Sequence, residues 1–150
     1  MKTAIRTIES NRDIAGCYAA MRQLRPHFTL EGFVARVLLQ RSLGYHLVAL
    51  EGEGGPVAVA GYQIRETLSD GRFLHVEDLV TLDQHRSRGY GAELLRWLVK
   101  RARELDCVSL QLDSAVWRKE AHHFYERQGL DRIAYHFALT TKSPRHPDIT

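Results

Sequence analysis

A strand-like segment, a turn with two glycines and a long amphipathic helix follow one another in the middle of the chain. The strand-like segment reads RFLHVEDLVTL (residues 72–82), and the turn reads HRSRGYG (residues 85–91). In the helix, predicted for 89–105, apolar residues recur at spacings of three and four, namely Leu94, Leu95, Leu98, Val99, Ala102 and Leu105. Such a helix is stable only when its apolar face packs against another layer, so the segment predicts an α/β domain.

The remaining segments predict further strands and helices around this unit. YHLVALEGEGGPVAVAGYQI consists of two apolar runs around a glycine-rich turn, which is typical of a β-hairpin. Residues 4–8, 108–113 and 131–140 have strand patterns. Helices are predicted at 11–25 and 30–40, which Pro26 separates, and within 118–130, where Gly129 ends the helix. The expected architecture is a single α/β domain with a mixed, mostly antiparallel sheet flanked by helices.

The length of 150 residues suits one domain, expected over 1–141, followed by a polar tail at 142–150. The chain contains neither a signal-peptide pattern nor the roughly 20 consecutive apolar residues of a membrane span, so a cytoplasmic protein without membrane contact is expected. Cys17 and Cys107 are far apart and lack metal-ligand spacing, which favours two reduced thiols and no metal site.

The net charge of +3 is compatible with an anionic ligand but does not by itself indicate nucleic acid. Basic residues fill the side of the predicted 89–105 helix that faces away from its apolar stripe: Arg96, Lys100, Arg101 and Arg103. Because no aromatic stacking residues interleave with them, a solvated helix face is favoured over a nucleic-acid surface.

The two glycines of the turn point to a ligand at the start of this helix. A helix N-terminus offers unpaired N–H groups and the positive end of the helix dipole, which together can hold a phosphate. Gly89 and Gly91 keep side chains out of that position, and Arg86 and Arg88 add positive charge. A tight turn without a ligand would give the same pattern. Neither a P-loop nor a GxGxxG motif is present.

Two motifs resemble the GNAT superfamily of acetyl-CoA-dependent N-acetyltransferases. RSRGYGA at 86–92 is similar to the family's [RQ]xxGxG/A signature, and EAHHFYERQGL at 120–130 resembles its A-x-x-F-Y-x-x-x-G-F block, with Leu130 in place of the last phenylalanine. The resemblance implies a GNAT fold, acetyl-CoA as cosubstrate and transfer of the acetyl group to an amine.

The resemblance also implies which residues hold acetyl-CoA. Backbone N–H groups would bind the pyrophosphate at Arg86, Ser87, Arg88, Gly89, Tyr90, Gly91 and Ala92. The backbone of Leu79, Val80 and Thr81 would pair with the pantetheine arm, on a strand that splays from the next one at a bulge. Many members have asparagine at the position of Arg118, which could instead reach a phosphate of CoA or be exposed.

For direct attack of a primary amine on the thioester, Tyr125 is the candidate acid that protonates the CoA sulfur, unless it is only a core aromatic residue. Glu77 is the candidate base, because VEDLVT resembles the E-D-x-x-V strand of spermidine/spermine-type acetyltransferases. Strand alternation is expected to place Glu77 and Leu79 on one face and Asp78, the second candidate, on the other. His75 could relay a proton or be structural.

The acceptor is expected near the two early helices, although the residues there could equally pack the helices together: Arg25, His27, Phe28, Glu31 and Phe33. A small-molecule amine and a protein amine both remain open as acceptors. A module of the same fold that binds acyl-CoA as a sensor or regulator, without transfer, is the alternative function. A homodimer through the C-terminal strands or sheet edges is compatible with the resemblance.

Overall fold

The computed structural model describes residues 2–142, so the predicted tail lies outside the described residues from 143 onward. The elements follow the order β1 (Ala4–Ile8), α1 (Asn11–Gly16), α2 (Tyr18–Leu24), α3 (Leu30–Ser42), β2 (Tyr45–Gly52), β3 (Gly55–Thr67), β4 (Gly71–Thr81), the 3₁₀ turn η1 (Asp83–His85), α4 (Tyr90–Glu104), β5 (Ser109–Leu112) and α5 (Lys119–Arg127).

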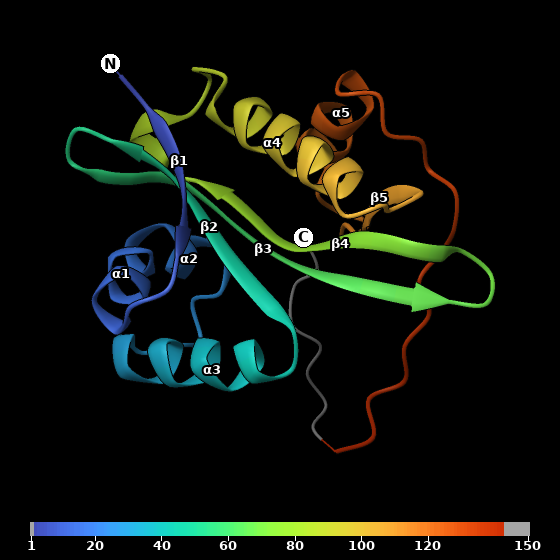
Figure 1. Ribbon diagram of the computed structural model, residues 1–150, viewed down its shortest axis with the longest axis horizontal. Helices are drawn as coiled ribbons and strands as arrows, with labels where there is room; N and C mark the ends of the chain where they lie inside the picture. Colours follow the sequence, from blue (N-terminus) through green and yellow to red (C-terminus); the bar gives the residue numbers. More distant parts are fainter. Residues whose placement is uncertain (1, 143–150) are drawn as a thin grey trace.

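The strands form one sheet in sequence order, β1-β2-β3-β4-β5. The pairs from β1 to β4 are antiparallel, whereas β5 runs parallel to β4 because α4 carries the chain back between them (Figure 1). The prediction of a mixed, mostly antiparallel sheet flanked by helices is confirmed.

Helices cover both faces of the sheet, and each face has its own apolar core (Figure 1). Val48 and Leu50 of β2 pack on the side of α4 and α5, here called the α4 face. Leu47 and Ala49 alternate with them and pack on the side of α1, α2 and α3, here called the α1–α3 face. Because side chains alternate between the two faces of a strand, each strand contributes residues to both cores.

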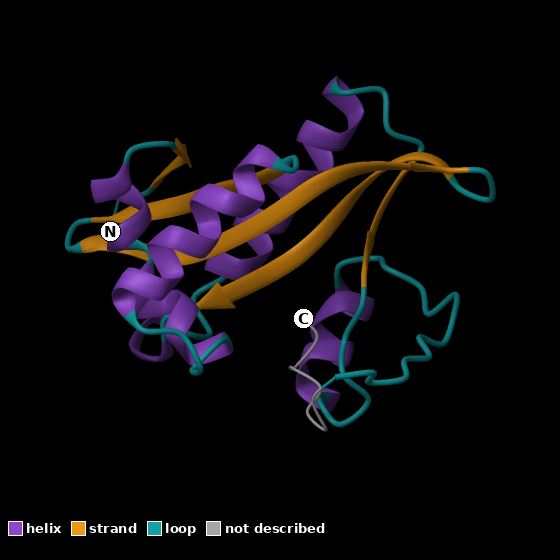
Figure 2. Cartoon of the chain, turned by 90° about the horizontal axis from the view of Figure 1, so that it is seen from below, coloured by secondary structure: helices purple, strands orange, loops and turns teal. Residues whose placement is uncertain are grey.

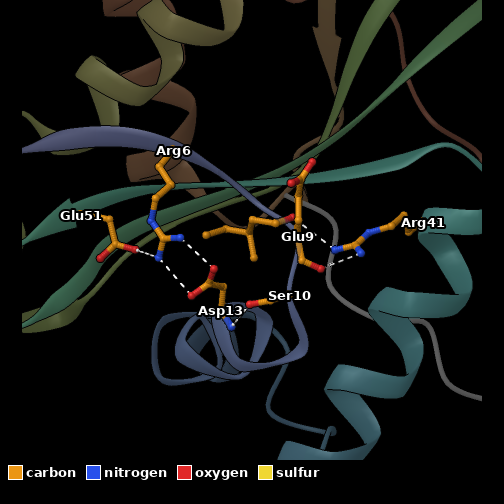
Figure 3. Close-up of polar contacts among 7 residues, drawn as sticks. Arg6, Glu9, Ser10, Asp13, Arg41 and Glu51 are labelled. Carbon is orange, nitrogen blue, oxygen red and sulfur yellow. Dashed lines mark hydrogen bonds and ion pairs between the residues drawn. The ribbon is translucent and has the colours of Figure 1, made fainter.

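Ion pairs and hydrogen bonds fasten the first strand to the helices beside it (Figure 3). Arg6 of β1 contacts Asp13 of α1 at 2.8 Å and Glu51 of β2 at 2.7 Å. Arg41 of α3 donates a hydrogen bond of 2.7 Å to the carbonyl oxygen of Glu9. Exposed ion pairs contribute at most about 1 kcal/mol each, so these contacts mainly orient the helices.

The amphipathic helix α4 behaves as its pattern predicts. Leu94, Leu95 and Leu98 are buried beneath it, and the basic residues Arg96 and Lys100 are exposed, which confirms a solvated outer face. Every described helix falls short of the length and apolarity needed to cross a bilayer.

Two expectations about the ends of the domain are corrected. The helix predicted for 11–25 is split into α1 and α2 at Cys17, whose N–H bonds to the carbonyl of Ile14, three residues back rather than four. The strand predicted for 131–140 is absent from the described chain, because that segment pairs with no neighbouring strand (Figure 1). Alternating apolar residues show that a segment is suited to a β-strand. Whether a neighbouring strand is in place to pair with it depends on the tertiary structure.

Candidate functional site

Strand β4 contains one extra residue at Glu77. Asp78 and Val76 pair with consecutive residues of β3, Gly61 and Tyr62, so the register of β4 shifts by one residue at Glu77. The parallel pairing with β5 also ends at Val76, opposite Leu112. Figure 2 shows β5 leading away from the other strands toward α5. The bulge and the splay expected from the resemblance are therefore confirmed.

The bulge shifts the alternation of β4 by one residue. Val76 and Leu79 both pack on the α4 face, although they are three positions apart and a regular strand would place them on opposite faces. Asp78 accepts a hydrogen bond from Arg25, directly after α2, and Glu77 pairs with Arg65 of β3, on the α1–α3 face. The expectation that Glu77 shares a face with Leu79 is wrong, because a bulge interrupts the two-residue repeat and leaves Glu77 on the same side as Asp78. Asp78 does lie on the face opposite Leu79, as expected.

Glu77 is half-buried at the start of the splay. Burial, followed by the negative charge of Asp78, raises the pKa of the Glu77 carboxyl, and the ion pair with Arg65 at 3.3 Å partly opposes this shift. The guanidinium of Arg25 donates a 3.0 Å hydrogen bond to the Glu77 carbonyl oxygen and so ties the bulge to the end of α2. A carboxylate with a raised pKa is a stronger base than an exposed one.

Asp78 is held by a buried network that the sequence analysis did not include. Arg25 donates to one carboxylate oxygen at 3.0 Å, and the hydroxyl of Tyr45 donates to the other at 2.7 Å. Tyr45 reaches Asp78 across β3 because Gly61 lies beneath it, where a Cβ would overlap the Tyr45 ring and hydroxyl. An isolated glycine inside the strand AVAGYQI is the signal that could have revealed this close approach.

Replacing Gly61 with alanine is expected to destabilise the fold by about 1–3 kcal/mol, because Tyr45 must leave its position and Asp78 loses a donor. Urea denaturation measures the change. Gly16→Ala is the control, since a Cβ at Gly16 meets nothing within 4 Å. Equal stability of the two variants would contradict the close packing of Tyr45 over Gly61.

The turn before α4 presents a run of unengaged backbone N–H groups. Among the described residues, the amides of 87–92 donate to no backbone carbonyl. Ser87 and Gly89 have left-handed φ angles of 63° and 81°. Such a turn directs successive N–H groups toward a common point, and the N-terminus of α4 adds its dipole there. The arrangement is that of an anion site.

The surroundings of this turn leave it accessible. Arg86 and Arg88 are exposed; Arg86 pairs with Asp83 at 2.9 Å, and both guanidiniums add positive charge beside the amides. A Cβ at Gly91 would meet the side chains of Phe124 and Thr81 at 3.5 Å, an ordinary contact. The folded chain itself therefore does not require glycine at 91, which is consistent with a ligand approaching the backbone there.

Tyr125 lies on the α4 face, opposite Glu77. It is 6% exposed, belongs to the core that includes Leu79, and contacts the ring of Phe124 edge-on at 5.5 Å between centroids. Burial raises the pKa of the Tyr125 hydroxyl, and the guanidinium of Arg118 partly opposes the shift. The phenol is therefore protonated at neutral pH and able to donate a proton. Arg118 lies half-buried beside it, rather than fully exposed.

Four side-chain atoms in the described part of the chain are buried without a hydrogen-bond partner: His75 Nδ1, Ser114 Oγ, Arg118 Nη1 and His122 Nδ1. Three of them belong to the β5–α5 connection and the start of α5. Buried polar groups nearly always have partners, so these atoms are exceptions within the described chain. Acetyl-CoA, with phosphates at one end, fits the amide run at the start of α4.

His75 lies next to the splay and shares a carboxylate with a second histidine. Its Nε2 is 3.6 Å from Asp113, and the Nδ1 of His136 is 3.4 Å from the same oxygen. Burial, and then the charge of Arg65, lower the pKa of His75, which favours the neutral ring. Nowhere in residues 2–142 do three His, Cys, Asp or Glu side chains gather as metal ligands.

A cavity of about 90 Å³ opens on the α1–α3 face beside Asp78. Of the residues considered for the acceptor pocket, Arg25, Phe28 and Phe33 line it, whereas His27 and Glu31 do not. Phe33 is also buried in the core of this face. The early helices thus pack against one another and enclose a small space near the candidate base.

Comparison with known proteins agrees with this arrangement. A family model described as "Acetyltransferase (GNAT) family" matches residues 8–130. An uncharacterized N-acetyltransferase of Bacillus subtilis, YhdJ, is 31% identical over 136 residues, which cover 89% of this chain and 95% of that protein. Aminoalkylphosphonate N-acetyltransferase of Salmonella typhimurium is 28% identical over 108 residues, covering 71% and 68%.

The fold is also similar to that of solved acetyltransferase structures. The aminoglycoside N-acetyltransferase AAC(6')-Iy, solved in complex with CoA, superposes with a TM-score of 0.81 over 95% of this chain and 96% of that one. At 13% identity this likeness concerns the fold alone.

Proposed function

The chain belongs to the GNAT family of acetyltransferases, and from this premise we propose that it acetylates a primary amine with Glu77 as the base and Tyr125 as the acid. The observation that supports the proposal is that Glu77 pairs with Arg65 on the α1–α3 face, next to the residue where the pairing of β4 with β5 ends, whereas Tyr125 is buried in the core of the α4 face. A thioester lying in the splay would be open to the amine on one face and to the phenol on the other.

Acetyl-CoA is the cosubstrate of this family and supplies the acetyl group as an activated thioester. The backbone amides of 87–92 would hold its pyrophosphate, with Arg86 and Arg88 beside them. Residues Leu79–Thr81 keep their ladder with β3 but pair with no residue of β5. The Thr81 carbonyl oxygen accepts from Gln23, and the other backbone groups on this side would pair with the pantetheine arm. Arg118, which lies beside Tyr125, would reach a phosphate of the cosubstrate.

Glu77 suits the role of base better than Asp78. Both oxygens of Asp78 already accept hydrogen bonds, from Arg25 and Tyr45, which hold that carboxylate in place. Glu77 combines partial burial, a raised pKa and a place at the bulge. Glu77 takes the proton of the attacking amine, directly or through water, and Tyr125 protonates the departing sulfur.

The acceptor would enter from the α1–α3 face. The cavity beside Asp78 has the volume of about three water molecules, so it can take only a small end group of the acceptor. We assign the acetyltransferase domain to residues 1–141.

A thiol-release assay with acetyl-CoA tests the activity across small amines, aminoalkylphosphonates, aminoglycosides and peptides with a free amine. Release above hydrolysis with at least one amine is expected; none with any amine would contradict the proposal.

Replacing Tyr125 with phenylalanine is expected to slow the chemical step by roughly 10²-fold while CoA affinity is kept, because the ring stays and the proton donor is lost. Single-turnover acetylation measures the step. Tyr62→Phe is the control, since Tyr62 is another buried tyrosine of the same core. Normal turnover of the Tyr125 variant, with an unchanged melting temperature, would leave Tyr125 as a core aromatic residue only.

A further inference from the structure

Two polar residues of α3 line the cavity beside Asp78. Arg36 and Gln40 are four positions apart, so their side chains lie next to each other on one face of the helix. Within residues 2–142 neither side chain forms a hydrogen bond or an ion pair, and Arg36 only lies over the Phe28 ring, 5.9 Å from its centroid. In the described chain, the wall of the cavity thus holds a guanidinium and an amide whose donors are available to a ligand.

The positive charge of Arg36 is not offset by the carboxylates around it. Asp78 pairs with Arg25 at 3.0 Å, and Glu77 has its own arginine partner in β3 at 3.3 Å. Glu31, in the first turn of α3, lines a separate groove against α1. The α3 side of the cavity is therefore positive, so it attracts an anionic group and repels a second cation.

The rest of the cavity limits the size and the shape of what can enter. Apolar side chains form much of its wall: Met21, Phe28, Phe33 and Val37. Its volume of about 90 Å³ suits a headgroup of a few heavy atoms, such as a carboxylate or a phosphonate. A guanidinium binds such a group through two parallel N–H donors, and the amide of Gln40 supplies a further donor.

We propose that the acceptor is an amine that also carries an anionic group, a carboxylate or a phosphonate, which Arg36 and Gln40 bind while the amine lies at Glu77. This inference rests on the proposed function, because it concerns the acceptor of the same reaction. Arg25 connects the two positions, since its guanidinium contacts Asp78 in the cavity wall and the carbonyl oxygen of Glu77. Arg36 and Gln40 are thus specificity-determining residues, and they disfavour polyamines.

Acetylation rates of amines that differ only in their far end test this preference. β-Alanine, 2-aminoethylphosphonate, propylamine and 1,3-diaminopropane share a two-carbon link between the amine and an end group that is anionic, anionic, neutral and cationic, respectively. We expect kcat/KM of the better anionic amine to exceed that of propylamine roughly 10-fold or more, and the diamine to be the poorest. The two anionic amines distinguish a carboxylate from a phosphonate. Equal rates for the anionic and neutral amines would overturn this inference while leaving acetyl transfer in place.

Replacing Arg36 with methionine is expected to raise KM for the anionic amine roughly 10-fold and to leave kcat and the KM for propylamine nearly unchanged, because a remote contact holds ground state and transition state equally. The fold should persist, since Arg36 is exposed. Arg96→Met is the matched control, because it removes the same charge from an exposed position of α4, across the sheet from α3 (Figure 1). Equal KM values for the two variants would overturn the inference.

A binding measurement that needs no acetyl transfer decides the inference alone if none of the amines is acetylated, a result that would count against the proposed function. Propylphosphonate has the anionic group and no amine, and saturating CoA keeps it away from the turn before α4. In ¹H–¹⁵N correlation spectra of the full chain, millimolar propylphosphonate is expected to shift the amide signals of residues 33–40, whereas propylamine is not. Unshifted signals in α3, or shifts that persist in Arg36→Met, would overturn the inference.

Discussion

Replacing Glu77 with glutamine is expected to lower the rate of acetyl transfer by roughly 10²–10⁴-fold, because the amide keeps the size of the side chain but cannot accept the proton of the amine. CoA affinity should stay near that of the wild type. The fold should persist, since the partly exposed ion pair between Glu77 and Arg65 contributes at most about 1 kcal/mol to the stability of the fold. Thiol release at saturating acetyl-CoA measures the rate, and calorimetry measures the affinity.

The pH profile gives this test a second readout. Because the pKa of Glu77 is raised, the acid limb of the rate should lie at higher pH than an exposed glutamate would give, and glutamine at 77 should remove it. Glu66→Gln is the control, since Glu66 is exposed near the end of β3. Full activity of the Glu77 variant at neutral pH would assign proton removal to Asp78 or to solvent.

Replacing Gly91 with glutamate is expected to abolish CoA binding. The new carboxylate would stand among the amides at the start of α4, where it would occupy the position of a phosphate and repel its charge. The domain should still fold, because a Cβ at 91 makes only ordinary contacts with Phe124 and Thr81. Calorimetric titration with CoA measures the loss, and the melting temperature reports on folding.

Gly54→Glu is the matched control for Gly91. It introduces the same charge in the β2–β3 turn, at a position where a Cβ meets no neighbour within 4 Å. Its CoA affinity should equal that of the wild type. If the Gly91 variant binds CoA as tightly as this control does, the pyrophosphate is not held at the start of α4.

Most of the elements could be predicted from the sequence because each depends on residues close together in the chain. The three- and four-residue spacing of Leu94, Leu95 and Leu98 identified α4, and Gly129, with a φ of 93°, ends α5 as expected. The two motifs at 86–92 and 120–130 identified the family for the same reason, since each is a local signature.

The candidate site was predictable only in part. The amide run at 87–92 lies where the glycines indicated it, because helix termini are local features. The network of Asp78 with Tyr45 and Arg25 could not be predicted from spacing, because its members come from β4, β2 and the end of α2. Gly61 leaves room for the Tyr45 side chain only because the fold places β3 between β2 and β4.

The sequence by itself determined the order of the helices and of the strands through β5, the family and the position of the glycine-containing turn before α4, since these follow from short-range patterns. Tertiary structure alone decided which face of β4 each carboxylate takes, because the bulge at Glu77 exists only in the pairing with β3. It also decided that 131–140 forms no strand within the described chain, despite its alternation. A strand needs the hydrogen bonds of a neighbour, and the neighbour lies outside the segment itself.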